Sequence, residues 1–253
     1  TSSLSVTAIA AALQRPGQFA GYHFFNPVPL MKVVEVIAGL KTDPAVCQRL
    51  TDFARQMGHT PVQAQDTPGF IVNRCARPYY GEALALLEQG RSTAEIDAAM
   101  VAAGYRLGPF ALIDLIGADI NLAATEGLAA AMVGHPRYHV FAALRAQVAK
   151  GDLGRKSGRG FVTSDAPPPP DAAAIALRIE AALANEAAWL LSEGGVTADG
   201  IDTAMKLGLN FPRGPFEALA LHGRPAVLTT LSALQAAAPQ AMKDRYTPAP
   251  GLA

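Results

Sequence analysis

The chain has 253 residues, of which 50% are hydrophobic and 17% are charged, a composition typical of a globular rather than a disordered protein. Its 21 acidic and 21 basic residues balance, so nucleic acid is not expected as a partner. No apolar stretch approaches the about 20 residues that a membrane span needs. The two cysteines, Cys47 and Cys75, have no metal-ligand spacing; they fit a reducing cytoplasmic location and predict no metal site.

The N-terminal part of the sequence alternates between helical and strand patterns. In chain order, we expect a helix over residues 6–13, strands over 20–25 and 31–37, a helix over 44–57 and a strand over 60–65. Two prolines in the turn at 26–29 cannot continue a strand ladder, so they separate the first two strands. Pro44 follows Asp43, a favourable N-cap residue, at the start of the second helix. This order is similar to the last part of a larger α/β domain.

Two titratable residues, His23 and Glu35, lie within the two apolar strands. Strand alternation places Glu35 on the same face as Val33 and Ile37, so its carboxylate is poorly solvated and needs a partner. An imidazole can be this partner, and the two residues then form an acid/base pair. The structural alternative is a core histidine bonded to the backbone beside a glutamate that points to solvent, since burial perturbs structural groups too.

The rest of the chain has mainly helical patterns. We expect helices over residues 70–89, 94–103, 108–116, 119–133 and 137–150. Pro78 should bend the first of these helices or start a new segment. The segment Ser-Thr-Ala-Glu at 92–95 matches a capping box. Four consecutive prolines at 167–170 predict a stiff linker and a domain boundary.

The sequence after the prolines repeats the sequence before them at an offset of about 105 residues, which indicates a duplicated helical unit. The repeated segments are 83–88, 96–100 and 108–110, which return as 187–193, 201–205 and 214–216. The second copy lacks the Pro-Gly-Phe-Ile-Val-Asn-Arg opening at 68–74. We therefore interpret it as a degenerate copy without a site of its own.

The segment from His23 to Glu35, with Phe-Phe-Asn-Pro-Val-Pro-Leu-Met-Lys between its ends, resembles the signature of the L-3-hydroxyacyl-CoA dehydrogenases. The resemblance implies that His23 and Glu35 are the catalytic pair. It also implies that Ser2 contacts substrate and nicotinamide, and that Asn73 lies near the substrate thioester. Two further residues, Asn26 and Lys156, occupy positions that contact the cofactor in the family.

Each of these further residues also has an ordinary structural interpretation. Ser2 fits a turn near the chain end, and Asn26 fits the start of an Asn-Pro turn. Asn73 fits a helix residue with a local hydrogen bond, although a buried amide requires a partner. Lys156 fits a solvated residue in a basic, glycine-rich loop.

The resemblance implies a mainly α fold with a small β remnant: the C-terminal strands of a Rossmann-type α/β domain, followed by two repeated helical domains like those of 6-phosphogluconate dehydrogenase. The expected divisions are 1–66 for the end of the NAD-binding domain, 67–165 for the first helical domain, 166–175 for the proline-rich linker and 176–253 for the degenerate second repeat. Within this family, the chain resembles the 3-hydroxybutyryl-CoA dehydrogenases, in the long bacterial form that has a duplicated helical domain.

The implied activity is the NAD-dependent interconversion of L-3-hydroxyacyl-CoA and 3-oxoacyl-CoA, in fatty-acid β-oxidation or in degradation of aromatic acids such as phenylacetate. The sequence contains no G-x-G-x-x-G fingerprint, and the chain opens at Thr1 without an initiator methionine. We therefore expect an N-terminally truncated enzyme that is inactive alone. The alternative is a non-catalytic helical dimerisation module with a relic site, because the family dimerises through its helical domain. The expected partners are an acyl-CoA substrate and, if the protein forms a homodimer, a second subunit. Alternatively, the two helical domains form a pseudo-dimer within one chain. No membrane partner is expected.

Overall fold

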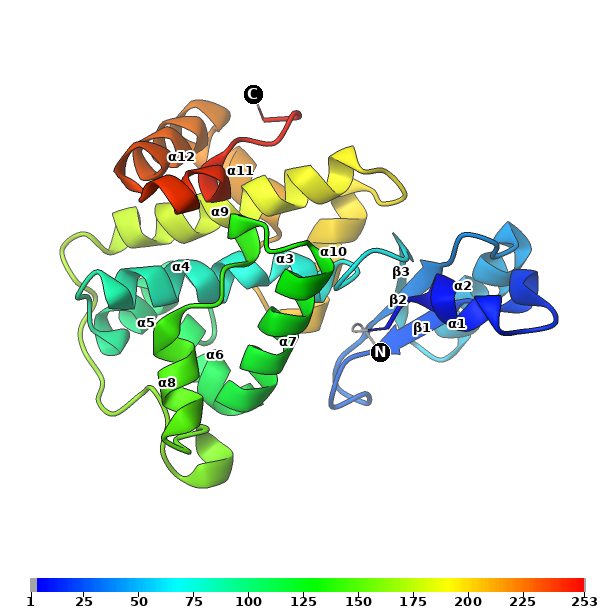
Figure 1. The fold of residues 1–253 in the computed structure, drawn as a ribbon, viewed down its shortest axis with the longest axis horizontal. Helices are drawn as coiled ribbons and strands as arrows, with labels where there is room; N and C mark the ends of the chain where they lie inside the picture. The colour runs from blue at the N-terminus through cyan, green and yellow to red at the C-terminus, as the bar shows by residue number, and fades with distance from the viewer. Residues whose placement is uncertain (1–3, 253) are drawn as a thin grey trace.

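The structure is a computed structural model that describes residues 4–252, most of which are helical (Figure 1). Ser2, one of the predicted site residues, lies outside the described residues. The strands of the described part form one small sheet in the order β1-β2-β3, with β1 at Gly21–Phe24, β2 at Val33–Ala38 and β3 at Thr60–Gln65. Strands β1 and β2 pair antiparallel, and β2 and β3 pair parallel. The expected mainly α fold with a small sheet is confirmed.

Helices cover both sides of the central strand β2, as its mainly apolar sequence requires. Helix α2, Pro44–Gln56, packs against β2 and β3 on the outer side of the sheet (Figure 1). Helix α10, Ala198–Leu209, packs against the same strands on the side of the helical body. As expected, Asp43 caps α2 by accepting a hydrogen bond from the Ala45 N–H. The strand that carries Glu35 is therefore buried from both sides.

The other helices of the described part are short or of medium length. They are α1 (Val6–Ala11), α3 (Val72–Cys75), α4 (Arg77–Glu88), α5 (Thr93–Ala102), α6 (Pro109–Ile116), α7 (Ala118–Ala131), α8 (Ala142–Ala149), α9 (Ala172–Ser192), α11 (Pro215–His222) and α12 (Arg224–Ala237). Short 3-10 helices lie at Pro16–Gln18, Pro136–Tyr138, Arg155–Ser157 and Gln240–Tyr246. The predicted capping box is present at the start of α5, where Ser92 and Glu95 exchange side chain-to-backbone hydrogen bonds.

Two boundaries differ from those expected from the sequence. The helix expected over 70–89 is divided at Ala76 into α3 and α4. Pro78 lies in the first turn of α4, where a missing N–H costs no helical hydrogen bond, so the expected restart at this proline is confirmed. Helix α9 begins at Ala172, before the expected end of the linker, because an alanine-rich sequence follows the prolines directly.

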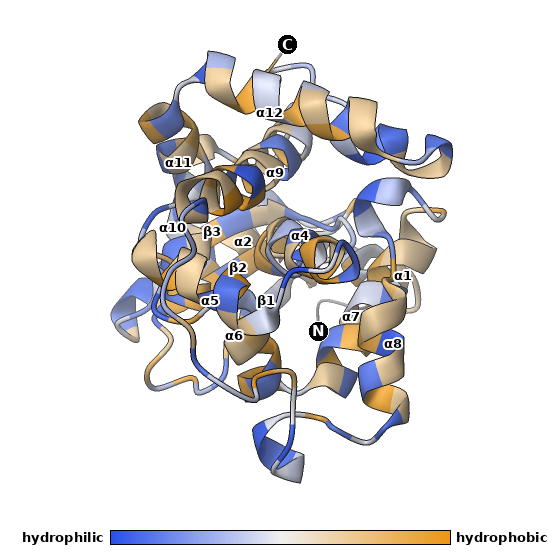
Figure 2. Ribbon diagram, turned by 90° about the vertical axis from the view of Figure 1, so that its left-hand side faces the viewer, coloured by the Kyte–Doolittle hydropathy of each residue, from blue (hydrophilic) through white to orange (hydrophobic). Residues whose placement is uncertain are grey.

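One hydrophobic core joins the sheet to helices on both sides of the proline segment. It includes Val33 of β2, Tyr79 of α4, Met100 of α5, Ile179 of α9 and Met205 of α10, all fully buried. Figure 2 shows hydrophobic residues concentrated at the centre of the molecule and hydrophilic loops at its lower edge. None of the helices between residues 4 and 252 combines the length and apolar character needed to cross a membrane.

A buried carboxylate on α4 connects the helices before and after the proline segment. Glu82, with no exposed surface, accepts hydrogen bonds of 2.8 Å from Nε of Arg178 on α9 and from Nε of Arg245 near the C-terminus. Burial alone would raise the pKa of Glu82, but the charges and hydrogen bonds of the two arginines outweigh it and lower the pKa below its ordinary value. Two cations thus share one buried anion.

Two more buried glutamates, Glu180 and Glu186, lie on α9 itself. Glu186 accepts a 2.8 Å hydrogen bond from Nε of Arg74 on α3, whose side chain is fully buried. Glu180 accepts a 3.0 Å hydrogen bond from the hydroxyl of Tyr105, after α5. Helix α9 therefore contacts the first set of helices through interior charges as well as through apolar packing.

Two aspartates at corresponding positions cap helices in the two halves of the helical body. Asp97 accepts hydrogen bonds of 2.9 and 2.8 Å from backbone N–H groups in the first turn of α6. Asp202 accepts hydrogen bonds of 2.9 and 3.0 Å from the first turn of α11. The glycines before these helices, Gly108 and Gly214, lie so close to their aspartates that an added Cβ would come within 2.4 Å of the Asp97 side chain and 2.3 Å of the Asp202 side chain. Both helix starts thus require a glycine.

We expect Asp97→Asn to remove part of the pH dependence of the free energy of unfolding. Burial raises the pKa of Asp97 to about 6, against the opposing effect of its two backbone hydrogen bonds. A carboxyl group whose pKa is higher in the folded than in the unfolded protein destabilises the fold when it ionises. The contribution of Asp97 to the free energy of unfolding therefore falls as the pH rises from about 4 through about 6. A shift of about two pKa units corresponds to about 3 kcal/mol.

Urea unfolding at about pH 4 and about pH 7 measures this difference. Asp165→Asn, a substitution of an exposed aspartate, is the matched control. The pH dependence should shrink in Asp97→Asn alone, and an identical pH dependence in wild type and Asp97→Asn would contradict the prediction.

Candidate active site

The predicted acid/base pair is formed across the sheet. His23 of β1 and Glu35 of β2 are direct neighbours in the antiparallel pairing, and neighbours of this kind have side chains on the same face. His23 Nδ1 lies 2.6 Å from Glu35 Oε2. The Asn-Pro-Val-Pro turn sets the offset of the two strands and so brings two residues twelve positions apart into contact.

The surroundings of Glu35 determine how the imidazole is protonated. Glu35 is completely buried, and its Oε1 accepts backbone hydrogen bonds from Ile71 N at 3.0 Å and Val72 N at 2.9 Å. These two backbone donors occupy Oε1 and leave Oε2 to face the imidazole. A carboxylate oxygen accepts hydrogen bonds, so His23 Nδ1 donates and Nε2 is left as the acceptor. This is the tautomer that a general base requires.

The histidine ring is held in place by aromatic neighbours. Its side chain is 16% exposed, and its ring meets those of Phe25 at 4.7 Å and Phe70 at 5.7 Å, edge to face. Phe70 has a positive φ of 48°, directly after Gly69 at 78°. This tight turn directs the N–H groups of the next two residues at Glu35.

The two backbone donors to Glu35 are functional groups that the sequence reasoning missed. For the Pro68-Gly69 pair, the sequence predicts only a position directly before the helix expected from residue 70. The sequence feature that indicates these donors is the turn-forming dipeptide immediately before a helix, because the first N–H groups of a helix lack helical partners. That these groups lie over Glu35 depends on tertiary packing, so the strand sequence alone does not reveal it.

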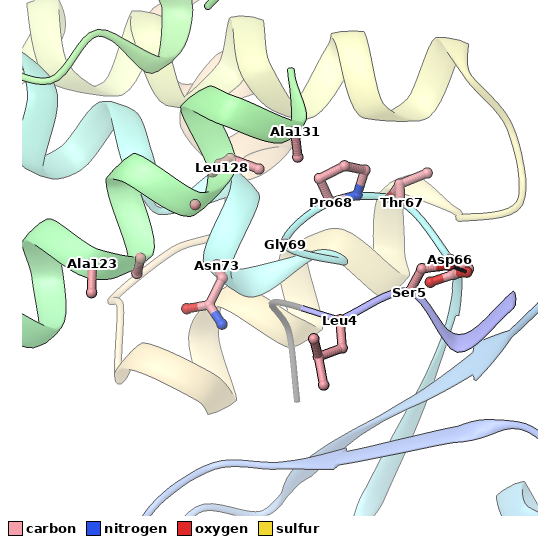
Figure 3. A pocket seen from close by; sticks show the side chains of 12 residues that line it. Leu4, Ser5, Asp66, Thr67, Pro68, Gly69, Asn73, Ala123, Leu128 and Ala131 are labelled. Atoms are coloured by element: carbon pink, nitrogen blue, oxygen red, sulfur yellow. Dashed lines mark hydrogen bonds between the residues drawn. The ribbon is translucent and has the colours of Figure 1, made fainter. Parts of the chain in front are cut away.

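A cavity of about 610 Å³ lies between the turn before α3 and helix α7, and its described lining includes neither His23 nor Glu35. Asn73 on α3 points into it, between Ala123 of α7 on one side and Leu4 on the other (Figure 3). Gly69 also lines this cavity, and the next residue packs on the ring of His23. The structure thus brings His23, Glu35 and Asn73 to one region.

Asp66 at the edge of this cavity has a structural role. Its carboxylate accepts hydrogen bonds from the Ser5 hydroxyl at 2.6 Å and from the backbone N–H groups of Val6 and Thr7 at 2.8 and 2.7 Å. Burial would raise the pKa of Asp66, but these hydrogen bonds lower it. Asp66 therefore fixes the start of α1 against the end of β3.

The structure does not bring the two predicted cofactor residues into the wall of this cavity. Asn26 is exposed in the turn after β1. Lys156 Nζ lies 2.5 Å from Oδ1 of Asp119, in the first turn of α7, and the two side chains are 44% and 36% exposed. Lys156 is thus paired rather than simply solvated, and the roles of both residues in cofactor binding stay predictions.

Comparison with known proteins identifies the relatives of this arrangement. The family model described as "3-hydroxyacyl-CoA dehydrogenase, C-terminal domain" matches residues 69–164 and 175–252. The model described as "3-hydroxyacyl-CoA dehydrogenase, NAD binding domain" matches residues 1–67. The expectation that the chain is truncated is therefore wrong in part, because both domain models of the family match it.

Individual relatives agree with the family models. The chain is 47% identical over 162 residues to 3-hydroxyadipyl-CoA dehydrogenase of Escherichia coli (strain K12), covering 63% of this chain and 34% of that protein. It is 45% identical over 163 residues to the human mitochondrial hydroxyacyl-coenzyme A dehydrogenase, covering 64% of this chain and 52% of that protein. The chain thus spans about a third to a half of the length of these relatives.

A solved structure extends the likeness to the whole described fold. The crystal structure of 3-hydroxybutyryl-CoA dehydrogenase from Escherichia coli K12 has a TM-score of 0.90 and 30% identity, and the match covers 100% of this chain and 73% of that chain. The class defined by these matches joins an NAD-binding domain to a C-terminal domain. The chain belongs to the 3-hydroxyacyl-CoA dehydrogenase family.

Proposed function

We propose that this chain carries the acid/base site of an enzyme that interconverts L-3-hydroxyacyl-CoA and 3-oxoacyl-CoA with NAD. The observation that carries the proposal is the 2.6 Å contact between His23 Nδ1 and the buried carboxylate of Glu35. A histidine oriented in this way has an acceptor nitrogen free to take a proton from a substrate, and histidine is the side chain most often used for proton transfer in enzymes. The proposed substrate partner is an acyl-CoA thioester.

In the oxidation direction, His23 Nε2 takes the proton of the substrate's C3 hydroxyl group. Glu35 orients the imidazole and stabilises the imidazolium that forms, while two backbone N–H groups hold its other oxygen in place. Asn73 offers an amide N–H to the thioester carbonyl oxygen, which positions C3 beside the imidazole. The chemistry that NAD would supply when bound is an acceptor for the hydride of C3.

The residues near the pair fit a nicotinamide cofactor in part. Asn26 follows the His23 strand and is exposed, so its side chain can exchange hydrogen bonds with a carboxamide. Lys156 would have to leave Asp119 before it could bind a cofactor oxygen. We therefore propose Asn26 as the stronger of the two cofactor contacts.

We further propose that the helical body consists of two copies of one unit, divided by the proline segment at 167–170. The paired aspartate caps of α6 and α11 support this proposal, as does the match of one domain model to two separate segments. Interior charge pairs join the two copies, so the second copy can take the place of a partner subunit within one chain. A homodimer through the same helices is the alternative.

The pathway follows from the substrate, and two pathways fit a 3-hydroxyacyl-CoA: fatty-acid β-oxidation and aromatic-acid degradation of the phenylacetate type. One relative is named for 3-hydroxyadipyl-CoA, and another solved relative for 3-hydroxybutyryl-CoA. The length and charge of the acyl chain that this protein accepts therefore decide which of the two pathways it serves.

The test is the reduction of acetoacetyl-CoA by the natural protein that carries this chain, followed as loss of NADH absorbance. We expect turnover that depends on both NADH and the thioester, and we expect free acetoacetate to react poorly because it lacks the CoA contacts. Measurable NADH binding with no turnover of any 3-oxoacyl-CoA would refute the proposal and favour a helical module with a relic site.

A further inference from the structure

The side chain of Arg77 on α4 is a buried cation whose hydrogen-bond partners are uncharged groups. It is 7% exposed, and its Nε donates a 3.0 Å hydrogen bond to the backbone carbonyl of Asn73. Its Nη1 donates to the Thr125 hydroxyl at 3.0 Å and to the Asn121 carbonyl at 3.4 Å. It forms no ion pair within residues 4–252, and burial lowers the pKa of its guanidinium group. Burying a cation without a counter-charge costs free energy, so this arginine requires a physical explanation.

The guanidinium group of Arg77 joins two helices that form walls of the cavity described above. Helix α3 carries Asn73, whose side chain points into this cavity, and α7 contributes another wall (Figure 3). Helix α3 has only four residues, and a helix of this length is not stable without tertiary contacts. The N–H of Val72, in the same helix, also holds the carboxylate of Glu35. Arg77 therefore fixes an element that serves both Asn73 and the acid/base pair.

The two proposed helical copies provide an internal comparison, because reciprocal ion pairs define their alignment. Arg74 of α3 pairs with Glu186 of α9 at 2.8 Å. Arg178 of α9 and Glu82 of α4 form the reverse pair at 2.8 Å. Each residue of the reverse pair is 104 positions away from its counterpart in the first pair. Helix α12 in turn begins 106 positions after α7. Residues of α4 and α7 can thus be matched individually with residues of α9 and α12.

The second copy has apolar residues at the positions that correspond to Arg77 and its two partners on α7. In the order Arg77, Asn121 and Thr125, the corresponding residues are Ala181, Val227 and Leu231. All three are fully buried members of one hydrophobic cluster, where α12 packs against α9. Replacing a buried charge by well-packed apolar residues is often neutral or stabilising. The corresponding pair of helices is therefore held without a buried cation in the copy that contains no predicted site residue.

We propose that Arg77 is a positioning residue of the catalytic centre: it holds α3 against α7 and thereby sets the place of the Asn73 amide relative to the substrate thioester. The inference rests on the function proposed above and adds a residue to it. A guanidinium group suits this task because its planar shape presents several N–H donors in fixed directions, so one side chain reaches acceptors on both helices. The copy that bears the site contains this destabilising cation, and the copy without a site does not.

A double-mutant cycle in the natural protein separates the positioning of Asn73 from a purely structural role. We expect Arg77→Met to lower kcat/KM for acetoacetyl-CoA reduction by about 10- to 100-fold, as a misplaced binding group does. In the Asn73→Ala background the same substitution should lower it by less than about threefold, because the amide that Arg77 positions is already absent. Arg77→Lys should restore part of the activity, since it keeps the charge but not the planar fork. A loss above about threefold in the Asn73→Ala background, or below about threefold in Arg77→Met alone, overturns the proposal.

A second variant carries the residues of the second copy: Arg77→Ala, Asn121→Val and Thr125→Leu together. Its urea midpoint should equal or exceed that of wild type, because apolar packing replaces the unpaired cation, while kcat/KM should fall as in Arg77→Met. A midpoint below that of wild type would show that the polar cluster stabilises the fold, and wild-type kcat/KM would show that it does not serve the site; either result overturns the proposal.

The matched control is Arg178→Met on α9. This substitution removes the ion pair with Glu82, and Arg178 is not among the described residues that line the cavity. It should lower the urea midpoint, because it leaves a buried carboxylate with one cation fewer, but change kcat/KM by less than about twofold. Stability and activity should thus respond in opposite ways in the two kinds of variant.

Failure of the proposed function itself gives a different result. Calorimetric binding of acetoacetyl-CoA without NADH requires no turnover, so the same cycle can be measured on Kd even if the natural protein does not reduce the thioester. Arg77→Met should raise Kd by about 3- to 10-fold, as expected for loss of one hydrogen bond, and by less than about twofold in the Asn73→Ala background. Equal changes in the two backgrounds refute the role of Arg77 alone, and a wild-type protein that does not bind the thioester refutes both proposals.

Discussion

Replacing His23 by glutamine should lower kcat for acetoacetyl-CoA reduction by about 10²- to 10⁴-fold, the range for loss of a general acid/base. Glutamine fills a similar volume and can still hydrogen-bond to Glu35, but it cannot carry a proton at the substrate oxygen. We expect KM for the thioester to change little, because the substrate is bound mainly by contacts away from this proton. Initial rates of NADH oxidation over a range of thioester concentrations separate the two parameters.

The matched control for this substitution is His59→Gln. His59 is half-buried beside Phe24 at the same sheet but has no contact with Glu35, so its loss should leave kcat within about twofold of wild type. Glu35→Gln should also lower kcat, since the imidazolium would lose its anionic partner. Full activity in His23→Gln would show that the proton is transferred elsewhere.

Replacing Glu82 by glutamine should lower the free energy of unfolding by about 3–5 kcal/mol, the cost of breaking a buried ion pair from one side. Glu82 has no exposed surface and holds two arginines, Arg178 and Arg245, whose side chains are 11% and 4% exposed. Glutamine keeps the size of the side chain but leaves both guanidinium groups without a counter-charge. Urea unfolding monitored by circular dichroism measures the change.

The control is Glu126→Gln on α7, which breaks an exposed ion pair with Arg145 and should cost about 0–1 kcal/mol. The lowered pKa of Glu82 adds a pH dependence. Its contribution to stability is present above the ordinary glutamate pKa of about 4.3 and is lost as the pH falls through the lower folded-state pKa. Equal destabilisation by the two substitutions would show that the buried anion is dispensable.

The local features of the fold follow well from the sequence. The turn with two prolines, the Asp43-Pro44 helix start and the capping box at Ser92 all involve residues within a few positions of each other, and all three are present. The break at Ala76 was expected near Pro78, but the exact division of the helix depends on packing of α3 against α10. The residues that form this contact lie far apart in sequence, so no local pattern predicts it.

The candidate site shows the same limit. The spacing and the strand pattern brought His23 and Glu35 together because both lie on one hairpin, where pairing is local. The backbone donors at residues 71 and 72 come from 36 and 37 positions beyond Glu35, and Arg245 reaches Glu82 across 163 positions. No periodicity in the sequence specifies contacts at such separations, so they required the structure.

The close approach of Gly208 on α10 to Val33 and Val72 limits which residues this helix can carry. A Cβ at Gly208 would lie only 3.1 Å from the Val72 side chain and 3.4 Å from that of Val33. Val33 belongs to the strand that bears Glu35, and Val72 donates a backbone hydrogen bond to the Glu35 carboxylate. We therefore expect the proposed catalytic pair to restrict the sequence of a helix that carries no predicted site residue, because a side chain at position 208 would displace the groups that hold Glu35.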